Sequence, residues 1–501
     1  MSDSKGAAAQ NSKTFYITTT LPYVNAEPHV GFATELIRAD VIARVKKLQG
    51  YEVFFNTGTD EHGQKLFDAA QKEGKDVQDY VDGFAERFKG LKEVLGVSED
   101  IHFIRTTDAQ HIKAAEAFWK RCDQNGYIYK KTYQAKYCVG CELEKTDSEL
   151  VDGRCPIHPG KDLEIIDEEN YFFKMSEFGD KLLAYYAENP NFVVPDFRFN
   201  EIKSFVERGL QDFSISRLKE KMSWGIPVPG DDKHVMYVWF DALTSYISTL
   251  GWNGEDADGA SDSLFNKFWK NGTPTQYCGK DNLRQQSATW QAMLMAAGLP
   301  NSHQIVIDGF LTGEGGIKMS KSIGNVVNPY DIVAEYGTDA LRYFCVAELS
   351  SFEDSPFTPE RFKESYNAKL ANGIGNLTNR VMKMAETYLV EAGEQDVIPE
   401  QSLAAQYAEY FALYDSYDLV KVSAYIWKHV EEANLIIQNE QPFKLVKENP
   451  EKGKEIIRDL VVRLYTIAEM LAPIIPSTSE KIKAAVRANK MPAEALFMRK
   501  D

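Results

Sequence analysis

The first 60 residues change from a strand pattern to a helix pattern and back. Thr14–Thr20 (TFYITTT) is β-branched and aromatic, which predicts a buried strand. Residues 32–50 are helical in spacing and stop at Gly50, with the apolar positions Leu36, Ile37, Val41, Val45 and Leu48. Residues 51–63 (YEVFFNTGTDEHG) predict a second strand that ends in a polar loop. A strand, a helix and a strand in this order predict a βαβ unit and a parallel, doubly wound α/β sheet.

Further along the chain the pattern weakens, returns and then becomes helical. Few periodic segments occur from about Asp108 to Asp232, which predicts an inserted domain. Strand patterns return in HVMYVWFDAL (234–243), TPTQYCGKD (273–281) and NSHQIVIDGF (301–310). From about Pro359 onward the spacing is helical almost throughout, which predicts a helical bundle.

These patterns predict five parts of the chain. They are a disordered tail (1–13), an α/β domain (14–115 and 233–330), an insertion (116–232), a linker (331–358) and a helical domain (359–501).

Length and charge limit the classes of function. A chain of 501 residues is too long for one ordinary core. Its net charge of −17 disfavours non-specific binding of polyanions, so any nucleic acid must bind locally. No apolar run approaches the roughly 18 residues of a membrane helix. The leading segment is polar and lacks the apolar stretch of a secretory signal, so we expect no membrane association and a cytoplasmic protein.

Three of the six cysteines lie within one short segment. Cys138 and Cys141 are separated by two residues, as are Cys155 and His158, and 13 residues lie between the pairs. Three thiolates and one imidazole at this spacing form a tetrahedral set that favours Zn²⁺. Four protein ligands leave no position for water, so we expect one structural zinc ion. The alternative is a loop with free cysteines.

Two polar segments have the composition of a phosphate site. His29 and Gly31 fall between the first strand and the first helix, where free N–H groups of a helix N-terminus attract anions. In GGIKMSKSIGN (315–325), Lys318 and Lys321 surround Met319 and Ser320 on a glycine-rich backbone. Mobile lysines suit a charge that develops during reaction, such as a departing pyrophosphate. The alternatives are a structural histidine and a solvated charged loop.

These motifs carry a family resemblance. HVG after the first strand and KMSKS after the last resemble the paired ATP-binding motifs of class I aminoacyl-tRNA synthetases. LPYVNAEPHVG, TGTDEHGQK, SWGIPVPG and YVWFDAL resemble segments of the methionyl-tRNA synthetases, and the similarity extends from about Thr14 to the final bundle.

The resemblance implies an ATP-dependent ligase that activates L-methionine to methionyl-adenylate, releases pyrophosphate and transfers methionine to tRNA(Met), with Mg²⁺ accompanying ATP. It implies a Rossmann-like catalytic domain, a zinc-knuckle insertion, a stem-contact region over 331–358 and a C-terminal helical domain that binds the anticodon.

Site residues follow from the same resemblance. The implied ATP-binding residues are His29, Gly31, Gly279, Asp281, Lys318, Met319, Ser320, Lys321 and Ser322, of which His29, Lys318 and Lys321 are catalytic. In the methionine site Asp60 receives the substrate amine, and the other implied residues are Leu21, Tyr23, Trp239, Ala242, Tyr246, Asn282 and Gln286. The implied anticodon-binding residues are Asn376, Arg380 and Phe443.

Three positions of the catalytic domain depart from the family pattern, and in the helical domain Phe443 stands where the family usually has a tryptophan. Phe32 replaces the second histidine of the first ATP motif, and loss of one transition-state donor costs on the order of 10²–10³ in rate. Asn282 and Gln286 replace an aliphatic residue and a histidine, so we expect a more polar amino-acid pocket. Two other functions therefore stay open: a class I synthetase for another apolar amino acid, or a non-catalytic tRNA-binding paralogue. Because the chain ends soon after the bundle, without the module that dimerises some relatives, we expect a monomer.

Overall fold

The computed structural model describes residues 13–501 except 146, 255–262, 318, 320–325 and 390–407. Two compact units make up the chain. The first unit consists of Met1–Glu27, Glu52–Gly90 and Asp100–Ile307, and the second of Pro28–Tyr51, Leu91–Glu99 and Asp308–Asp501. The five predicted domain boundaries stay a prediction, and the tail 1–13 lies almost wholly outside the described residues.

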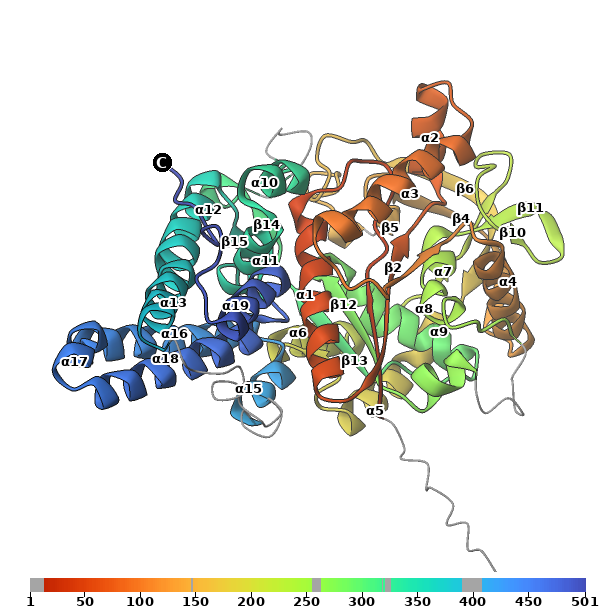
Figure 1. Ribbon diagram of the computed structural model, residues 1–501. Coiled ribbons are helices and arrows are strands. Elements are labelled where there is room, and N and C mark those ends of the chain that lie inside the picture. The colour runs from red at the N-terminus through yellow and green to blue at the C-terminus, as the bar shows by residue number, and fades with distance from the viewer. Residues whose placement is uncertain (1–12, 146, 255–262, 318, 320–325, 390–407) are drawn as a thin grey trace, which may run out of the picture. The chain divides into compact units, whose positions relative to one another are not determined.

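A parallel sheet forms the centre of the first unit (Figure 1). Its strands, in spatial order, are β3 (His102–Arg105), β2 (Glu52–Thr59), β1 (Thr14–Thr19), β12 (Pro274–Gly279), β13 (Gln304–Asp308) and β7 (Val193–Val194). Ile17 of β1 is opposite Phe55 of β2 on one side and Thr275 of β12 on the other, in parallel register. The chain moves outward from β1 to β3 and later resumes on the opposite side of β1, which confirms the predicted doubly wound sheet.

Aromatic side chains fill the core of this unit. Phe118 stacks on Trp290 with ring centroids 5.6 Å apart, and Tyr16 of β1 packs against Phe54 and Trp269. The helices that begin in this unit are α2 (Gln64–Lys72), α3 (Val77–Val94), α4 (Ala109–Gln124), α5 (Gly179–Glu188), α6 (Asp196–Glu207), α7 (Val238–Ala242), α8 (Ser245–Ser248) and α9 (Trp290–Ala296).

The predicted insertion contains an antiparallel sheet. In spatial order its strands are β5 (Leu143–Lys145), β4 (Ile128–Cys138), β6 (Glu164–Phe173) and β8 (Phe213–Ser214). The four candidate metal ligands are Cys138 at the end of β4, Cys141 between β4 and β5, and Cys155 and His158 between β5 and β6, and we call the described part of residues 138–158 the metal loop. The insertion also supplies β7, one of the two edge strands of the parallel sheet, which the sequence pattern did not reveal.

One predicted strand is confirmed only in its first residues. HVMYVWFDAL divides into β11 (Asp231–Met236) and helix α7, and β11 pairs with β9 (Ser216–Leu218) and β10 (Pro227–Val228) in a separate antiparallel sheet. Trp239 and Ala242 are therefore on a helix. The segments 273–281 and 301–310 do contain strands of the central sheet, β12 and β13.

Buried charges hold the second unit around α1 (Val30–Leu48). Arg38 donates to Asp308 Oδ1 at 2.8 Å and to the carbonyls of Cys345 and Leu349. Arg342 donates to Asp40 Oδ2 at 2.7 Å. Four of the five predicted apolar positions of α1 are buried, whereas Leu48 is 47% exposed.

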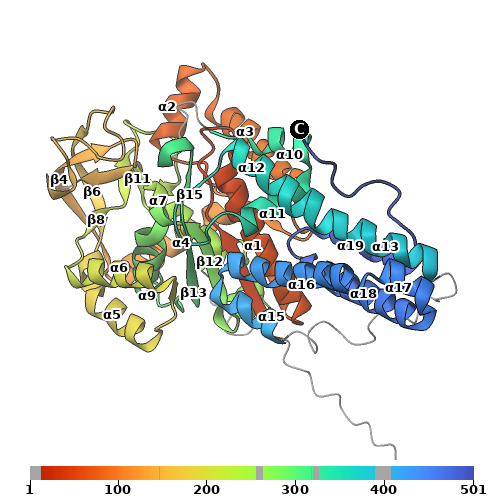
Figure 2. The ribbon, with the colours of Figure 1, turned by 90° about the vertical axis from the view of Figure 1, so that its left-hand side faces the viewer.

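The predicted C-terminal helices are confirmed within the described residues. The remaining elements are β14 (Leu311–Thr312), α10 (Pro329–Tyr336), α11 (Thr338–Ala347), β15 (Ser355–Pro356), α12 (Pro359–Ser365), α13 (Asn376–Tyr388), α15 (Ala408–Leu413), α16 (Leu419–Glu440), α17 (Pro442–Glu448), α18 (Pro450–Leu471) and α19 (Pro476–Ala488). Figure 2 shows α16 and α18 side by side, with α17 where the chain turns from one to the other. Among the described helices, none has the length and apolar character that crossing a membrane requires.

Candidate active site and metal centre

Asp60 is a buried carboxylate at the end of strand β2. It is 5% exposed, its N–H donates to the carbonyl of Pro22, and its Oδ1 has no hydrogen-bond partner among the described residues. Burial holds the pKa of this carboxyl well above its usual range, and the charges of Asp241 and Glu142 add to the effect. A bound cation would favour the ionised form that burial disfavours, so this carboxyl group is suited to bind an ammonium group.

Several candidate residues share the edge of the sheet where Asp60 lies. Leu21 and Tyr23 follow β1, Asp60 follows β2, and Gly279 ends β12. Carboxyl ends of parallel strands meet at one edge, and ligands bind there at the point where strand order reverses. Tyr23 pairs directly with Asp60 through an isolated parallel bridge. Segments far apart in the sequence thus meet at the place where an α/β sheet holds its ligand.

Trp239, Ala242 and Tyr246 lie on the short helices α7 and α8. Tyr246 is 3% exposed, and Gln286 Nε2 donates to its hydroxyl at 2.6 Å. Gln286 is fully buried, and its Oε1 has no hydrogen-bond partner among the described residues. One amide hydrogen of Gln286 is thus already donated to the hydroxyl of Tyr246. Asn282 is half-buried and donates to Asp281 Oδ1 at 3.2 Å.

A buried histidine pair beside Asp60 was not selected from the sequence. Asp241 accepts from His62 Nδ1 at 2.7 Å and from His111 Nε2 at 2.6 Å. Burial opposes ionisation of Asp241, but the two histidines outweigh it and lower the pKa of this carboxyl. The quoted segments TGTDEHGQK and YVWFDAL contain His62 and Asp241, so their polar residues were the available signal.

Tyr23 is held by neighbours that the sequence reasoning also missed. Its hydroxyl faces the carbonyl oxygen of His62 at 2.5 Å and Glu142 Oε2 at 2.8 Å. Gly63 has φ +115°, and a Cβ at this position would lie 2.0 Å from the Tyr23 hydroxyl oxygen. Only glycine lets the backbone approach the tyrosine this closely.

The four predicted metal ligands come together. The ligand atoms of Cys138, Cys141, Cys155 and His158 all lie within 4.8 Å of one another. Cys141 Sγ is 3.4 Å from Cys155 Sγ and 3.3 Å from His158 Nδ1. A Cβ on Gly140 would lie 2.4 Å from the imidazole of His158, so the glycine makes room for that ring. The donor set and its mutual distances fit a tetrahedral ion with Zn–S bonds of about 2.3 Å.

His29 caps helix α1. Its Nδ1 accepts from the N–H of Gly31 at 3.1 Å, and a Cβ on Gly31 would lie 2.8 Å from the imidazole ring. A neutral imidazole that accepts at Nδ1 carries its proton on Nε2, which can donate to a phosphate oxygen. Phe32, the departure from the family pattern, is buried.

The other candidate ATP residues divide into two groups. Gly279 and Asp281 are described, and a Cβ on Gly279 would lie 3.0 Å from Asp281 Oδ1. Met319 is half-buried. The remaining four, Lys318, Ser320, Lys321 and Ser322, lie outside the described residues.

In the second unit, Arg380 and Phe443 line one cavity of about 380 Å³. Arg380 donates to Asn434 Oδ1 at 2.9 Å, and Phe443 is 41% exposed. Asn376 is exposed one turn before Arg380 on α13, and it does not line this cavity. The other lining residues are Asn379, Lys383, Met384, Ile437 and Met491.

Comparisons with known proteins cover both units. The model of a family described as tRNA synthetases class I (M) matches residues 15–163 and 158–382. A Methionine--tRNA ligase from Thermotoga maritima is 39% identical over 96% of this chain and 76% of its own length. One from Rickettsia conorii is 40% identical over 97% of this chain and 95% of its own.

A solved structure is similar over the same extent. Mycobacterium tuberculosis methionyl-tRNA synthetase bound by methionyl-adenylate matches with a TM-score of 0.86 at 34% identity, covering 97% of this chain and 100% of the other.

Proposed function

The chain belongs to the class I tRNA synthetases of the methionyl type, and from this premise we propose how its residues perform the reaction. It is a methionine–tRNA ligase, which activates L-methionine with ATP to methionyl-adenylate and transfers the methionyl group to tRNA(Met). The observation that carries the site assignment is Asp60, a buried carboxylate whose Oδ1 has no partner among the described residues and which pairs with Tyr23 at the reversal point of the sheet.

Asp60 pairs with the substrate ammonium in this proposal. Tyr23, Trp239 and Tyr246, with Leu21 and Ala242, surround the thioether, because sulfur gains about 0.3–1.5 kcal/mol from contact with an aromatic ring. Gln286 and Asn282 add polar groups to the same pocket. The pocket thereby matches methionine, which has one cationic end and one polarizable apolar end.

Activation is an in-line displacement at phosphorus. A carboxylate oxygen of methionine attacks the α-phosphate of ATP, a new O–P bond forms, and the bond from that phosphorus to the bridging oxygen of pyrophosphate breaks. His29 donates from Nε2 to a phosphate oxygen, and Lys318 and Lys321 neutralise the departing pyrophosphate. Gly31, Gly279, Asp281, Met319, Ser320 and Ser322 complete the proposed ATP site. Mg²⁺ accompanies ATP and shields its phosphate charge.

The second step transfers the methionyl group from the adenylate to tRNA. A hydroxyl of the terminal ribose of tRNA attacks the carbonyl carbon of methionyl-adenylate, and AMP leaves with the electrons of the broken bond. Recognition of the tRNA depends on the second unit, where Phe443 stacks on an anticodon base and Arg380 and Asn376 donate hydrogen bonds. Stacking of this kind is worth about 1–3 kcal/mol per base.

One structural zinc ion is proposed at Cys138, Cys141, Cys155 and His158, because three thiolates and one imidazole close its coordination. Such an ion would have a structural role, because it would join Cys138, at the end of β4, and Cys141, between β4 and β5, to Cys155 and His158, which lie between β5 and β6.

ATP–pyrophosphate exchange tests this function with each of the twenty amino acids in turn. Methionine should be the single amino acid that drives exchange. Exchange with leucine, isoleucine or valine would identify a sister synthetase. A folded protein that supports no exchange with any amino acid would instead be a non-catalytic paralogue.

A further inference from the structure

Glu142 occupies an unusual position next to the candidate metal centre. It directly follows the ligand Cys141, its φ of 52° is left-handed, and its side chain is only 3% exposed. This conformation is unfavourable for a non-glycine residue, and such residues persist where their surroundings fix them. A buried carboxylate adds a desolvation cost. Both costs require compensating contacts.

The side chain and the backbone of Glu142 both reach the methionine side of the unit. The two carboxylate oxygens lie 2.8 and 3.0 Å from the hydroxyl of Tyr23, and Oε1 also accepts from the N–H of Lys65 at 3.3 Å. The carbonyl of Glu142 accepts from the hydroxyl of Tyr237, a residue that directly precedes α7. One residue of the metal loop thus contacts both sequence segments that supply the thioether pocket.

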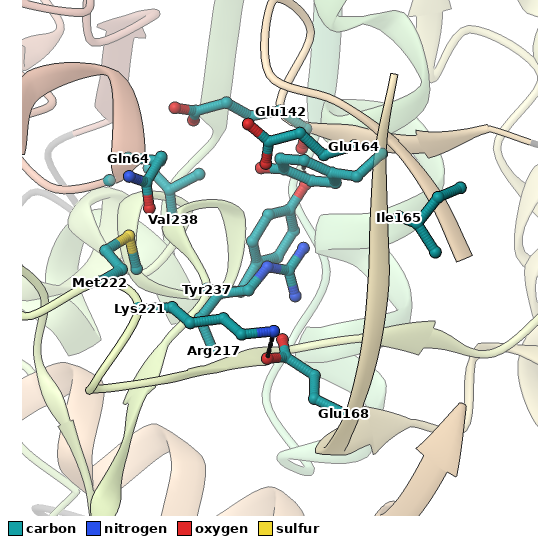
Figure 3. Close-up of a pocket in the computed structure, with 12 residues that line it drawn as sticks. Gln64, Glu142, Glu164, Ile165, Glu168, Arg217, Lys221, Met222, Tyr237 and Val238 are labelled. Atoms are coloured by element: carbon teal, nitrogen blue, oxygen red, sulfur yellow. Dashed lines mark hydrogen bonds and ion pairs between the residues drawn. The ribbon is translucent and has the colours of Figure 1, made fainter. Parts of the chain in front are cut away.

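Tyr237 is itself fixed in place. Figure 3 shows the guanidinium of Arg217 against the ring of Tyr237, with Glu142 at the same cavity. The Cζ atom of Arg217 lies 4.8 Å from the centroid of that ring, and the cavity has a volume of about 100 Å³. Arg217 also lies 4.9 Å from the ring centroid of Tyr137, one residue before the ligand Cys138. The stacked groups connect the start of the metal loop to the segment that leads into α7.

Tyr23 has little freedom to move away from Glu142. The carbonyl of His62 lies on one side of its hydroxyl, and the backbone of Gly63 approaches so closely that a methyl group would not fit. The hydroxyl of Tyr23 therefore lies between this backbone and the carboxylate of Glu142, so the metal loop determines one side of its site.

We propose that Glu142 is a positioning residue that fixes Tyr23 in the methionine site and so couples the metal loop to methionine affinity. This inference rests on the proposed function, because it takes Tyr23 as a methionine contact. Glu142 acts through Tyr23 and touches neither ATP nor the reacting carboxylate.

Three variants test it: Glu142→Ala, the conservative Glu142→Gln, and Asp147→Ala as a matched control. Asp147 is on the same loop, and its exposed carboxylate pairs with Lys136 at 2.6 Å. Methionine Kd is measured by calorimetry, and KM for methionine, KM for ATP and kcat are measured by pyrophosphate exchange. Metal content is determined for each purified protein.

Glu142→Ala should raise the methionine Kd and KM about tenfold, the lower end expected for a hydrogen bond to a charged group. KM for ATP should stay within about twofold, and the zinc content should stay at about one per chain. Glu142→Gln should recover most of the affinity, because its amide oxygen still accepts from Tyr23. Asp147→Ala should match the parent protein. A tenfold loss of methionine affinity in Glu142→Ala, with the metal retained, would therefore be assigned to the lost contact with Tyr23.

A double-mutant cycle with Tyr23→Phe separates positioning from general destabilisation. If Glu142 acts through Tyr23, the double variant should have about the same methionine Kd as the single variant with the higher Kd. Fully additive losses would overturn the inference, as would an unchanged Kd in Glu142→Ala or equal losses for methionine and ATP. Failure of the proposed function is a separate result, since the parent protein itself would then show no methionine-dependent exchange.

Discussion

Replacement of Asp60 by asparagine keeps the shape of the side chain and removes its charge. In the free protein the carboxylate is 5% exposed and one oxygen has no partner among the described residues, so its favourable pairing comes from the substrate ammonium. Breaking a buried ion pair costs about 3–5 kcal/mol, and each 1.4 kcal/mol is a factor of ten in Kd. The charge of Asp241 remains close to this position, which favours the lower value. Methionine Kd should therefore rise about 100-fold.

A methionine analogue with a hydroxyl in place of the amine provides the control for calorimetry. It carries no ammonium, so Asp60→Asn should weaken its binding by less than about threefold. The refuting results are a loss for methionine below tenfold, or equal losses for methionine and the hydroxy analogue.

The raised pKa of Asp60 also gives a pH dependence with a defined sign. Only the ionised carboxylate pairs with ammonium, and its pKa in the free protein lies well above the usual range. Methionine Kd should therefore fall as pH rises through that pKa and then level off, and Asp60→Asn should abolish this step.

The raised pKa of Asp60 also affects stability, because the ionised carboxylate is unfavourable for folding at pH above both its folded and unfolded pKa. The ligand-free Asn variant should then have a higher Tm at neutral pH, and a lower Tm would contradict the argument.

Three further changes test other parts of the account. Lys321→Ala should lower kcat of pyrophosphate exchange by about 10² while leaving methionine Kd unchanged, because the lysine acts on charge in the transition state; equal losses in both would exclude that role. Gly140→Ala should reduce zinc content below about one per chain, since the added methyl group would displace the ring of His158; full retention of zinc would show that the loop adapts. Arg342→Ala should lower the free energy of unfolding by about 3 kcal/mol, because it breaks one buried ion pair of Asp40 and removes the donor to the carbonyls of Pro473 and Ile474, while Arg44 and Ser98 still donate to Asp40; a loss below 1 kcal/mol in chemical denaturation would contradict this.

The sequence pattern predicted those parts of the fold whose signals lie within a short segment of the chain. Segments rich in β-branched and aromatic residues predicted β1, β2, β12 and β13 of the sheet, because such side chains pack well on a buried pleated surface. The metal loop was predictable because four ligands at fixed spacing need no knowledge of distant contacts. Trp239 was assigned to a strand and lies on α7, because a short apolar run does not distinguish a buried helix from a buried strand.

Features that depend on distant segments could not be predicted from pattern. Glu142 and Tyr23 are 119 residues apart, and nothing local to either residue indicates the other. Helical periodicity places charged residues on the solvent side, yet Arg38 and Asp40 of α1 are buried among partners from other segments. Such pairs are set by tertiary contacts that exist only in the folded chain.

Charging of a tRNA(Met) transcript with radiolabelled methionine in the presence of ATP tests directly whether this chain is a methionine–tRNA ligase. We expect acid-stable methionyl-tRNA to form, and its formation should depend on ATP, on the anticodon of the transcript and on Asp60. A protein that binds methionine and the transcript but forms no methionyl-tRNA would contradict this expectation.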